Sequence, residues 1–409
     1  MLGVGCDIQP QDIKDYYGGY IMHLLPFQTD FDITMLCMYN CKHCNVDAGS
    51  RMNDEMNTDQ IKSVLDQLDE IGVSDLSITG GEPLLRKDVF EILSYAGDKK
   101  GFKLTLNTNG LLLNESVIKF LEIKCPQILI AVSLDGYNPE TYSILRRNAN
   151  DPKRILKPEF EQIISNLSML VKSSLQIGVN YTVTQSTVEN IFKTYDLIQQ
   201  IGIKQMLAIK FFPYGAGRRN IAELELPYRL WKKFIVAATE KKKNDEYYHG
   251  MQISTTCPWE VYLPLLSERY DREFIEEIWD YCTPLKSEFY RKYRSLGCHA
   301  GITSCAISPN GDIYPCGTIS TKFPPFICGN LKESSLQEIW NNSSVLKSLR
   351  EIDISQMKGH CLNCHLKEIC GGGCRARAFT EYNDLTAPDY LCPLQNSFMK
   401  GEEYENVCY

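Results

Sequence analysis

No stretch of about 18 consecutive apolar residues, the length that a membrane-spanning helix requires, occurs in this 409-residue sequence. Residues 1–10 also lack the basic segment and long apolar run of a secretory signal. We therefore expect neither a membrane anchor nor export. The 17 cysteines are then better explained as reduced metal ligands than as disulfides, so we expect a cytoplasmic protein.

Basic residues are in deficit, because 43 Lys and Arg stand against 51 Asp and Glu and give a formal net charge of −8. This balance argues against nucleic acid and acidic membranes as main partners. Apolar residues make up 44% of the chain, which is ordinary for a globular protein with a substantial core. The length leaves room for a full catalytic domain and a smaller second one.

A fourth cysteine is missing near Cys37, Cys41 and Cys44, because the next one along the chain is Cys125. A structural zinc site needs four protein ligands in closed tetrahedral geometry, so zinc suits this group poorly. A cubane iron–sulfur cluster held by only three cysteines leaves one iron open to a substrate or cofactor. Zinc binding and a chance grouping are the alternatives.

A second motif, Gly80-Gly81-Glu82-Pro83, follows a short buried strand predicted at residues 76–79. Its glycines permit close backbone approach to a ligand. The Glu82 carboxylate can accept a charge-assisted hydrogen bond from an ammonium group. A tight strand-to-helix turn without a ligand is the structural alternative.

The Cys-x3-Cys-x2-Cys spacing, with His43 before the last cysteine, and the Gly-Gly-Glu-Pro loop together resemble the radical S-adenosylmethionine (SAM) superfamily. The resemblance implies that the three cysteines hold a [4Fe–4S] cluster and that the loop binds the amino group of the SAM methionine. It also implies reductive cleavage of SAM to a 5′-deoxyadenosyl radical that abstracts hydrogen from an unactivated carbon.

Between residues 27 and 214 the sequence alternates strands and helices, which predicts a parallel sheet with helices outside it. The fold class we expect is α/β, a partial (β/α)6 TIM-like barrel of the kind that superfamily members form, with a C-terminal cysteine-rich domain. We expect strands near residues 31–34, 76–79, 103–107, 128–133, 176–183 and 206–212, and helices near 58–71, 87–98, 114–122, 158–173 and 188–201.

Polar residues follow several of the predicted strands, and barrel enzymes place their chemistry at the carboxyl ends of strands. Relatives use similar stretches to bind the ribose or carboxylate of SAM, and Arg146 or Arg147 on the next predicted helix could pair with a carboxylate. Turn capping by Asn, Ser and Asp is the alternative. The candidate SAM-binding residues are His43, Gly80, Gly81, Glu82, Pro83, Asn107, Asn109, Ser133, Asp135 and Arg146.

Eight cysteines beyond residue 297 are enough for two fully ligated cubanes, and their order resembles the SPASM domain of many radical SAM enzymes. The resemblance implies interleaved ligation, in which one cluster takes Cys298, Cys305, Cys316 and Cys374 and the other takes Cys361, Cys364, Cys370 and Cys392. Two zinc ribbons are the alternative. We leave Cys6, Cys125, Cys328 and Cys408 as free thiols, and Cys257 and Cys282 as core residues.

These patterns divide the chain into five parts and imply three [4Fe–4S] clusters besides SAM. The parts are an N-terminal arm (1–27), the barrel (28–219), a helical bridging region (220–297), the SPASM domain (298–392) and a tail (393–409). A reducing partner such as flavodoxin or ferredoxin would supply the electron. No catalytic residue is identified.

For the substrate, the resemblance favours a peptide or protein side chain, altered by crosslinking, epimerisation or a similar maturation. A small molecule such as a tetrapyrrole side chain is the alternative, and a non-enzymatic iron–sulfur carrier is a third possibility. Gly317 follows Cys316 at the position where sulfatase-maturing relatives carry a catalytic aspartate. Glycine cannot accept a proton, so we do not expect formylglycine formation.

Overall fold

The computed structural model describes residues 26–254, 259–279, 298–319 and 323–394. They form two compact units. The barrel unit takes its described residues from 24–226 and 300–347, and the helical unit takes them from 227–299 and 348–409. The predicted N-terminal arm lies almost wholly outside the described residues. No described helix is long and apolar enough to cross a membrane.

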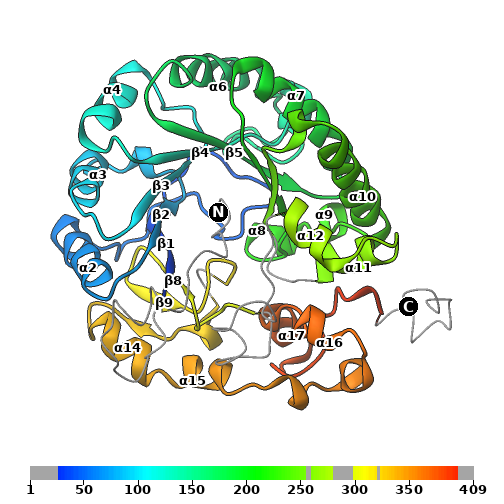
Figure 1. Ribbon diagram of the computed structural model, residues 1–409. Helices are drawn as coiled ribbons and strands as arrows, with labels where there is room; N and C mark the ends of the chain where they lie inside the picture. The colour runs from blue at the N-terminus through cyan, green and yellow to red at the C-terminus, as the bar shows by residue number, and fades with distance from the viewer. Residues whose placement is uncertain (1–25, 255–258, 280–297, 320–322, 395–409) are drawn as a thin grey trace. The chain divides into compact units, whose positions relative to one another are not determined.

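In the barrel unit, parallel strands pair in chain order and are surrounded by helices (Figure 1). The strands are β1 (Gln28–Thr34), β2 (Asp75–Gly80), β3 (Lys103–Thr108), β4 (Leu129–Ser133), β5 (Gln176–Val183) and β6 (Met206–Lys210). The helices between them are α2 (Thr58–Glu70), α3 (Val89–Gly97), α4 (Glu115–Lys124), α5 (Pro139–Tyr142), α6 (Lys157–Leu170) and α7 (Ile191–Ile201). The predicted α/β partial barrel is confirmed.

Helix α2 shows how the sequence determines one of these elements. Its apolar residues recur at helical spacing and bury Ile61, Val64, Leu65 and Leu68 against the sheet. Asn57 caps the first turn, because its side chain accepts from Gln60 N–H at 2.9 Å while the Gln60 side chain accepts from Asn57 N–H at 2.9 Å. This reciprocal capping box satisfies two main-chain donors that the helix itself cannot pair.

Three local predictions differ from the structure. Strand β6 ends at Lys210, two residues before the predicted end, and Pro213 follows shortly after. Helix α7 begins at Ile191, because residues 188–190 form a 3₁₀ turn. Arg146 lies in the irregular segment after α5, not on a helix, since α5 ends at Tyr142 after a single turn.

Short strands extend the sheet beyond β1. Strand β8 (Ser304–Ile307) pairs in parallel with β1, with Cys305 opposite Thr29, and β9 (Asp312–Tyr314) and β10 (Gly329–Asn330) follow in antiparallel pairing. Further helices of this unit are α8 (Ala216–Arg219), α9 (Ile221–Leu224) and α14 (Leu336–Asn342), while α15 (Ser344–Arg350) spans the boundary at 347. Residues 300–347 therefore belong to the same compact unit as the barrel strands. The domain boundaries drawn from the sequence stay a prediction.

The helical unit contains short elements around buried polar contacts. They are α10 (Tyr228–Asn244), β7 (Met251–Ser254), α11 (Trp259–Leu266), α12 (Arg272–Ile278), α16 (Lys367–Cys370) and α17 (Arg375–Tyr382). Trp279 donates to Thr239 Oγ1 at 2.9 Å, and Tyr262 donates to Glu276 Oε1 at 2.8 Å.

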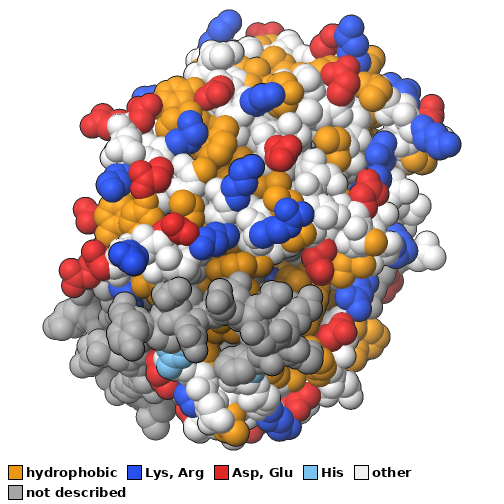
Figure 2. Space-filling model, turned by 90° about the vertical axis from the view of Figure 1, so that its right-hand side faces the viewer, with side chains coloured by type: hydrophobic (Ala, Val, Ile, Leu, Met, Phe, Trp, Pro, Cys, Tyr) orange, Lys and Arg blue, Asp and Glu red, His pale blue; other side chains and the backbone are white. Residues whose placement is uncertain are grey.

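On the face drawn in Figure 2, basic and acidic side chains of the described residues are interspersed, without a large basic patch.

The inner face of β1 carries two acidic residues. Asp30 and Asp32 lie opposite Ser77 and Thr79 of β2, and Thr79 lines the pocket at the strand ends, so all four side chains share the barrel's inner face. Burial raises the pKa of both carboxyls, and repulsion by Asp30 helps to raise that of Asp32 to about 8. Asp32 Oδ2 has no hydrogen-bond partner among the described residues.

Asp32 should make stability depend on pH. Its pKa is raised from 3.8 to about 8, so the native state holds the proton more tightly than the unfolded chain does. This group's contribution should therefore be most favourable below 3.8 and fall as the pH rises towards 8. Asp32→Asn should make the urea-unfolding midpoint depend less on pH between 3.8 and about 8. It should also raise that midpoint near neutral pH. The matched control is Asp54→Asn, at an exposed site.

Main-chain hydrogen bonds connect the end of β2 to the segment after β1. Gly81 N–H donates to the Thr34 carbonyl at 2.7 Å, and Glu82 N–H donates to the Leu36 carbonyl at 2.8 Å. A Cβ on Gly80, whose φ is +129°, would lie 2.3 Å from the Thr34 oxygen, and one on Gly81 would lie 2.3 Å from the Leu36 oxygen. The glycines are therefore needed because two chain segments approach closely here.

Gly81→Ala should displace Leu36 and the cysteine segment that begins at Cys37. We expect the variant to fold but to lose the iron of the predicted three-cysteine site, which iron analysis and electron paramagnetic resonance (EPR) after anaerobic reconstitution would measure. Gly49→Ala is the matched control, because a Cβ there meets no atom within 4 Å although Gly49 also bonds to Cys37. Normal loading of Gly81→Ala would contradict the argument.

Candidate functional site

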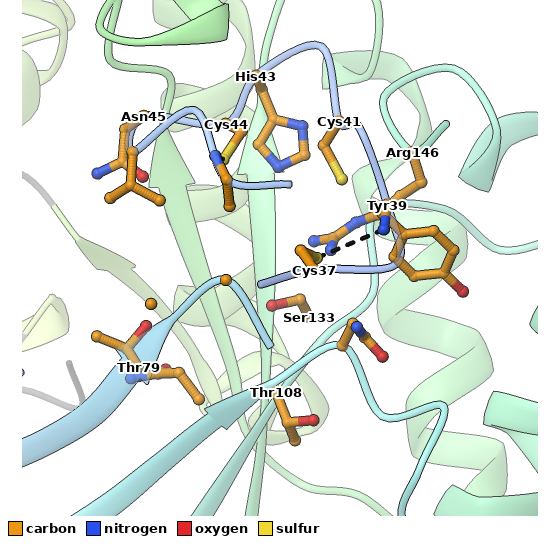
Figure 3. A pocket seen from close by; sticks show the side chains of 16 residues that line it. Cys37, Tyr39, Cys41, His43, Cys44, Asn45, Thr79, Thr108, Ser133 and Arg146 are labelled. Atoms are coloured by element: carbon orange, nitrogen blue, oxygen red, sulfur yellow. Dashed lines mark hydrogen bonds between the residues drawn. The ribbon is translucent and has the colours of Figure 1, made fainter. Parts of the chain in front are cut away.

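A pocket of about 160 Å³ lies at the carboxyl ends of the barrel strands (Figure 3). The cysteine segment after β1 forms one wall, and the ends of β2, β3 and β4 form the other. Sixteen residues line it. Those that the sequence predicted are Cys37, Cys41, His43, Cys44, Gly80, Gly81, Asn107, Asn109, Ser133 and Arg146.

The thiols of Cys37, Cys41 and Cys44 come together in this pocket. Burial is the main cause that raises the pKa of Cys37 to about 11 and that of Cys41 to about 12, and the neighbouring thiols contribute to both values. Two of the sulfurs accept hydrogen bonds from main-chain N–H groups. Tyr39 N–H donates to Cys37 Sγ at 3.5 Å, and Ala48 N–H donates to Cys44 Sγ at 3.4 Å. Such donors stabilise thiolates, so the residues present fit a metal cluster.

A single metal ion fits the described residues less well than a cluster does. No group of three or more His, Cys, Asp or Glu side chains in the described ranges is close enough to hold one ion. A cubane distributes its cysteine ligands over separate irons, so it does not need that closeness. The preference for a cluster over zinc therefore rests on the sequence, in which these three cysteines stand without a fourth one nearby.

His43 lies within the cysteine segment as a neutral side chain. Burial lowers its pKa to about 4, although nearby Asp135 acts in the opposite direction. Its Nε2 is 3.8 Å from Asp135 Oδ2, and its Nδ1 is buried without a partner among the described residues. An unpaired buried nitrogen at the edge of the pocket is suited to a hydrogen bond with a bound group.

Glu82 does not line the pocket, although Gly80 and Gly81 do. Its carboxylate is completely buried and accepts from Thr108 Oγ1 at 2.8 Å, Asn109 N–H at 2.8 Å and Leu84 N–H at 3.1 Å. Glu82 thus organises the ends of β2 and β3 in this form of the protein. The glycine main chain is the part of this loop that reaches the pocket, and a SAM contact from Glu82 stays a prediction.

Asp135 is also engaged with protein groups. It accepts from Arg146 Nε and Nη2, each at 2.7 Å, and from Thr182 N–H at 2.7 Å. Burial alone would raise its pKa, but Arg146, His43 and Thr182 together lower it. Asp135 lies outside the pocket lining and holds Arg146, whose side chain is part of that lining.

Uncharged polar side chains at the ends of β3 and β4 face the pocket. Asn107 Oδ1 accepts from Asn180 Nδ2 at 3.0 Å, while Asn109 Nδ2 contacts Met38 Sδ at 3.0 Å. Ser133, at the end of β4, lies in the pocket wall (Figure 3). Pro83 begins the 3₁₀ turn after the glycines and is buried outside the lining.

Several residues that shape the site were not predicted. Thr79 and Thr108 line the pocket, and their positions on the inner strand face could have indicated this. Glu55 accepts from Met35 N–H at 2.8 Å and so holds the start of the cysteine segment. Gly215, at φ +54°, packs so closely that a Cβ would lie 2.4 Å from the Asn45 carbonyl. No local sequence signal links these last two residues to the site.

In the helical unit, four cysteines predicted to hold one auxiliary cluster lie close together. Burial raises the pKa of Cys370 to about 12, and the thiols of Cys361 and Cys364 add to the effect. The pKa of Cys392 is raised by burial and by Cys370 and Cys361. These mutual effects indicate that the four thiols lie near one another, as ligands of one cluster would have to.

The other auxiliary set is distributed over both units. Strand pairing of β8 with β9 places Cys305 beside the segment that contains Cys316, while Cys298 and Cys374 belong to the helical unit. This ligand set stays a prediction. Cys125 and Cys328 are buried thiols that contact the carbonyls of Leu93 and Phe326. Cys6, Cys257, Cys282 and Cys408 lie outside the described residues.

Comparisons with known proteins agree with this geometry. Residues 32–225 match the family model of the radical SAM superfamily, and residues 298–365 match SPASM, an iron–sulfur cluster-binding domain. In Streptococcus suis, the structure of SuiB bound to the precursor peptide SuiA superposes with a TM-score of 0.68 at 20% identity, covering 90% of this chain and 76% of that one. At this level of sequence identity, the structural similarity shows that the two chains share a fold.

Two relatives from Methanosarcina barkeri match over most of the chain. The AdoMet-dependent heme synthase is 31% identical over 364 residues, which are 88% of this chain and 95% of the relative. The Fe-coproporphyrin III synthase is 24% identical over 389 residues, which are 91% and 90% of the two chains. With both cysteine regions matched, the chain belongs to the radical SAM superfamily and is an enzyme with a C-terminal SPASM domain.

Proposed function

We propose that this enzyme abstracts hydrogen from a tetrapyrrole side chain. The observation that carries the proposal is the match at 31% identity over 95% of a relative named as a heme synthase. The Fe-coproporphyrin III synthase supports the same class of substrate. These relatives favour the small-molecule alternative over the peptide substrate that the sequence alone had favoured.

The peptide-bound SuiB structure is no comparable support for a peptide substrate. At 20% identity it shows a common fold, and this chain matches 76% of the SuiB chain. Position 317 also argues against base-dependent peptide oxidation. A Cβ at Gly317 would lie 2.0 Å from Asp30 Oδ2, so an aspartate could not stand there without displacing Asp30.

The chain's residues then have separate tasks at the pocket. Cys37, Cys41 and Cys44 would hold the [4Fe–4S] cluster, which together with SAM supplies the radical chemistry. Ser133, Asn107 and the Gly80–Gly81 main chain line the pocket and would contact SAM there.

Arg146 and His43 would set the electrostatics of that pocket. Arg146 is held by Asp135, so its direction is fixed before any ligand arrives. Its positive charge lowers the pKa of Cys37 and Cys41 against the dominant effect of burial, and thus favours the thiolates that bind iron. His43 stays neutral and offers one ring nitrogen.

The proposed cofactor inventory is three [4Fe–4S] clusters, one that binds SAM and two auxiliary ones. The auxiliary clusters have four cysteine ligands each and no open iron, so we propose electron transfer as their role. A flavodoxin or ferredoxin is the proposed reductant.

Iron analysis would test the inventory. The anaerobically reconstituted enzyme should contain about twelve irons, that is about four for each cubane. Replacing Cys37, Cys41 and Cys44 together by Ala should remove about four irons and all SAM cleavage, because the two auxiliary sites keep their ligands. A wild-type content near four irons would show that the auxiliary clusters are absent.

The substrate proposal predicts a mass change in a porphyrin. Enzyme, SAM and dithionite are incubated without oxygen with iron coproporphyrin III, and chromatography with mass spectrometry follows 5′-deoxyadenosine and the porphyrin together. We expect an altered porphyrin in step with deoxyadenosine, and none with the triple cysteine variant. Deoxyadenosine formation with unchanged porphyrin would contradict the proposal. An unrelated cysteine-containing peptide serves as the control substrate and should stay unmodified.

A further inference from the structure

Helix α17 carries two completely buried arginines that are compensated in different ways. Arg377 forms ion pairs with Asp389 at 2.7 Å and with Glu260 at 3.0 Å. Arg375 is also 0% exposed, but no carboxylate among the described residues forms an ion pair with it. A buried charge without a counter-ion is costly, so a negatively charged group beside Arg375 would stabilise it.

The guanidinium of Arg375 binds main-chain carbonyls from the segments that carry the cysteines. Its Nη1 donates to the Leu385 carbonyl at 2.9 Å and the Ala387 carbonyl at 2.7 Å, in the segment before Cys392. Nη2 donates to the Gly372 carbonyl and Nε to the Gly373 carbonyl at 3.3 Å, both in the loop after Cys370. Nη1 also contacts Met357 Sδ at 3.5 Å, before Cys361.

These contacts bring the positive charge close to the cysteine sulfurs. Gly372 links the two directly, because its N–H donates to Cys370 Sγ at 3.2 Å while its carbonyl accepts from Arg375 Nη2. Lys367 lies between Cys364 and Cys370 and is another nearby cation, but it is only partly buried. Arg375 is therefore a fully buried cation beside this set of cysteines, and unlike Arg377 it has no carboxylate partner among the described residues.

We propose that Arg375 is the counter-ion of the auxiliary cluster held by Cys361, Cys364, Cys370 and Cys392, and that it raises the reduction potential of that cluster. Reduction adds one electron from an external reductant and breaks no bond, so the cluster gains one negative charge. A buried cation stabilises that added charge more than water-exposed groups do. The inference rests on the proposed auxiliary cluster and is independent of the substrate.

The test is a potentiometric titration of the full-length reconstituted enzyme followed by EPR. The signal of this cluster is identified as the one that is lost in the Cys361→Ala/Cys364→Ala variant. Arg375→Gln should lower its reduction equilibrium constant by about tenfold, which is about 59 mV for one electron. Arg375→Lys keeps the charge and should stay near wild type, although it lacks the guanidinium fork.

Lys367→Gln is the matched control, since it removes a partly exposed charge near the same cysteines and should shift the potential much less. Equal potentials in wild type and Arg375→Gln, with full iron loading, would overturn the proposal. Loss of this cluster from both Arg375 variants would assign the residue to the scaffold alone and would overturn it too. If the Cys361→Ala/Cys364→Ala variant kept all its iron, the auxiliary cluster itself would be disproved, which is a different failure.

Discussion

The contact between the glycine loop after β2 and the main chain after β1 determines where the cysteine segment lies. Two N–H groups of the loop, of Gly81 and Glu82, donate to the carbonyls of Thr34 and Leu36 at 2.7 and 2.8 Å. Cys37 follows directly, so this contact fixes the first thiol against the strand ends that carry Ser133 and Asn107. The motif therefore has two tasks, because Gly81 lines the pocket and, together with Glu82, binds the cysteine segment to the barrel.

Buried charges near the pocket are satisfied by the protein before a ligand binds. Glu82 accepts three hydrogen bonds from the chain, and Asp135 holds both Arg146 and the main chain of Thr182. Satisfying a buried carboxylate in this way limits its desolvation cost. It also leaves Arg146 and His43 beside the three thiols and the neutral amide and hydroxyl groups that line the pocket, which suits a ligand that carries its own charges.

The barrel and its pocket could be predicted from the sequence because their signals are local. Strand periodicity, the cysteine spacing and the Gly-Gly-Glu-Pro loop each lie within a few residues, and parallel strands bring their carboxyl ends to one edge. The supports from Glu55 and Gly215 could not be predicted, because they depend on contacts between distant segments. Ligand contacts from Glu82 and Asp135 stay predictions, and what the sequence could not show is that protein donors already surround both carboxylates. Substrate class could not be predicted from these local signals, since the chain matches relatives named as heme synthases and relatives named as maturases.

The Gly371-Gly372-Gly373 run in the helical unit illustrates how a small segment can be ordered without a large apolar core. All three residues have positive φ values, of 64°, 81° and 78°, which other residues rarely adopt. The resulting turn directs the Gly372 N–H to Cys370 Sγ at 3.2 Å and the Gly372 and Gly373 carbonyls to Arg375. Ordering glycine costs more conformational entropy than ordering any other residue, so these polar contacts must offset that cost. The loop therefore couples the conformation of the cysteine ligands to the position of one buried cation.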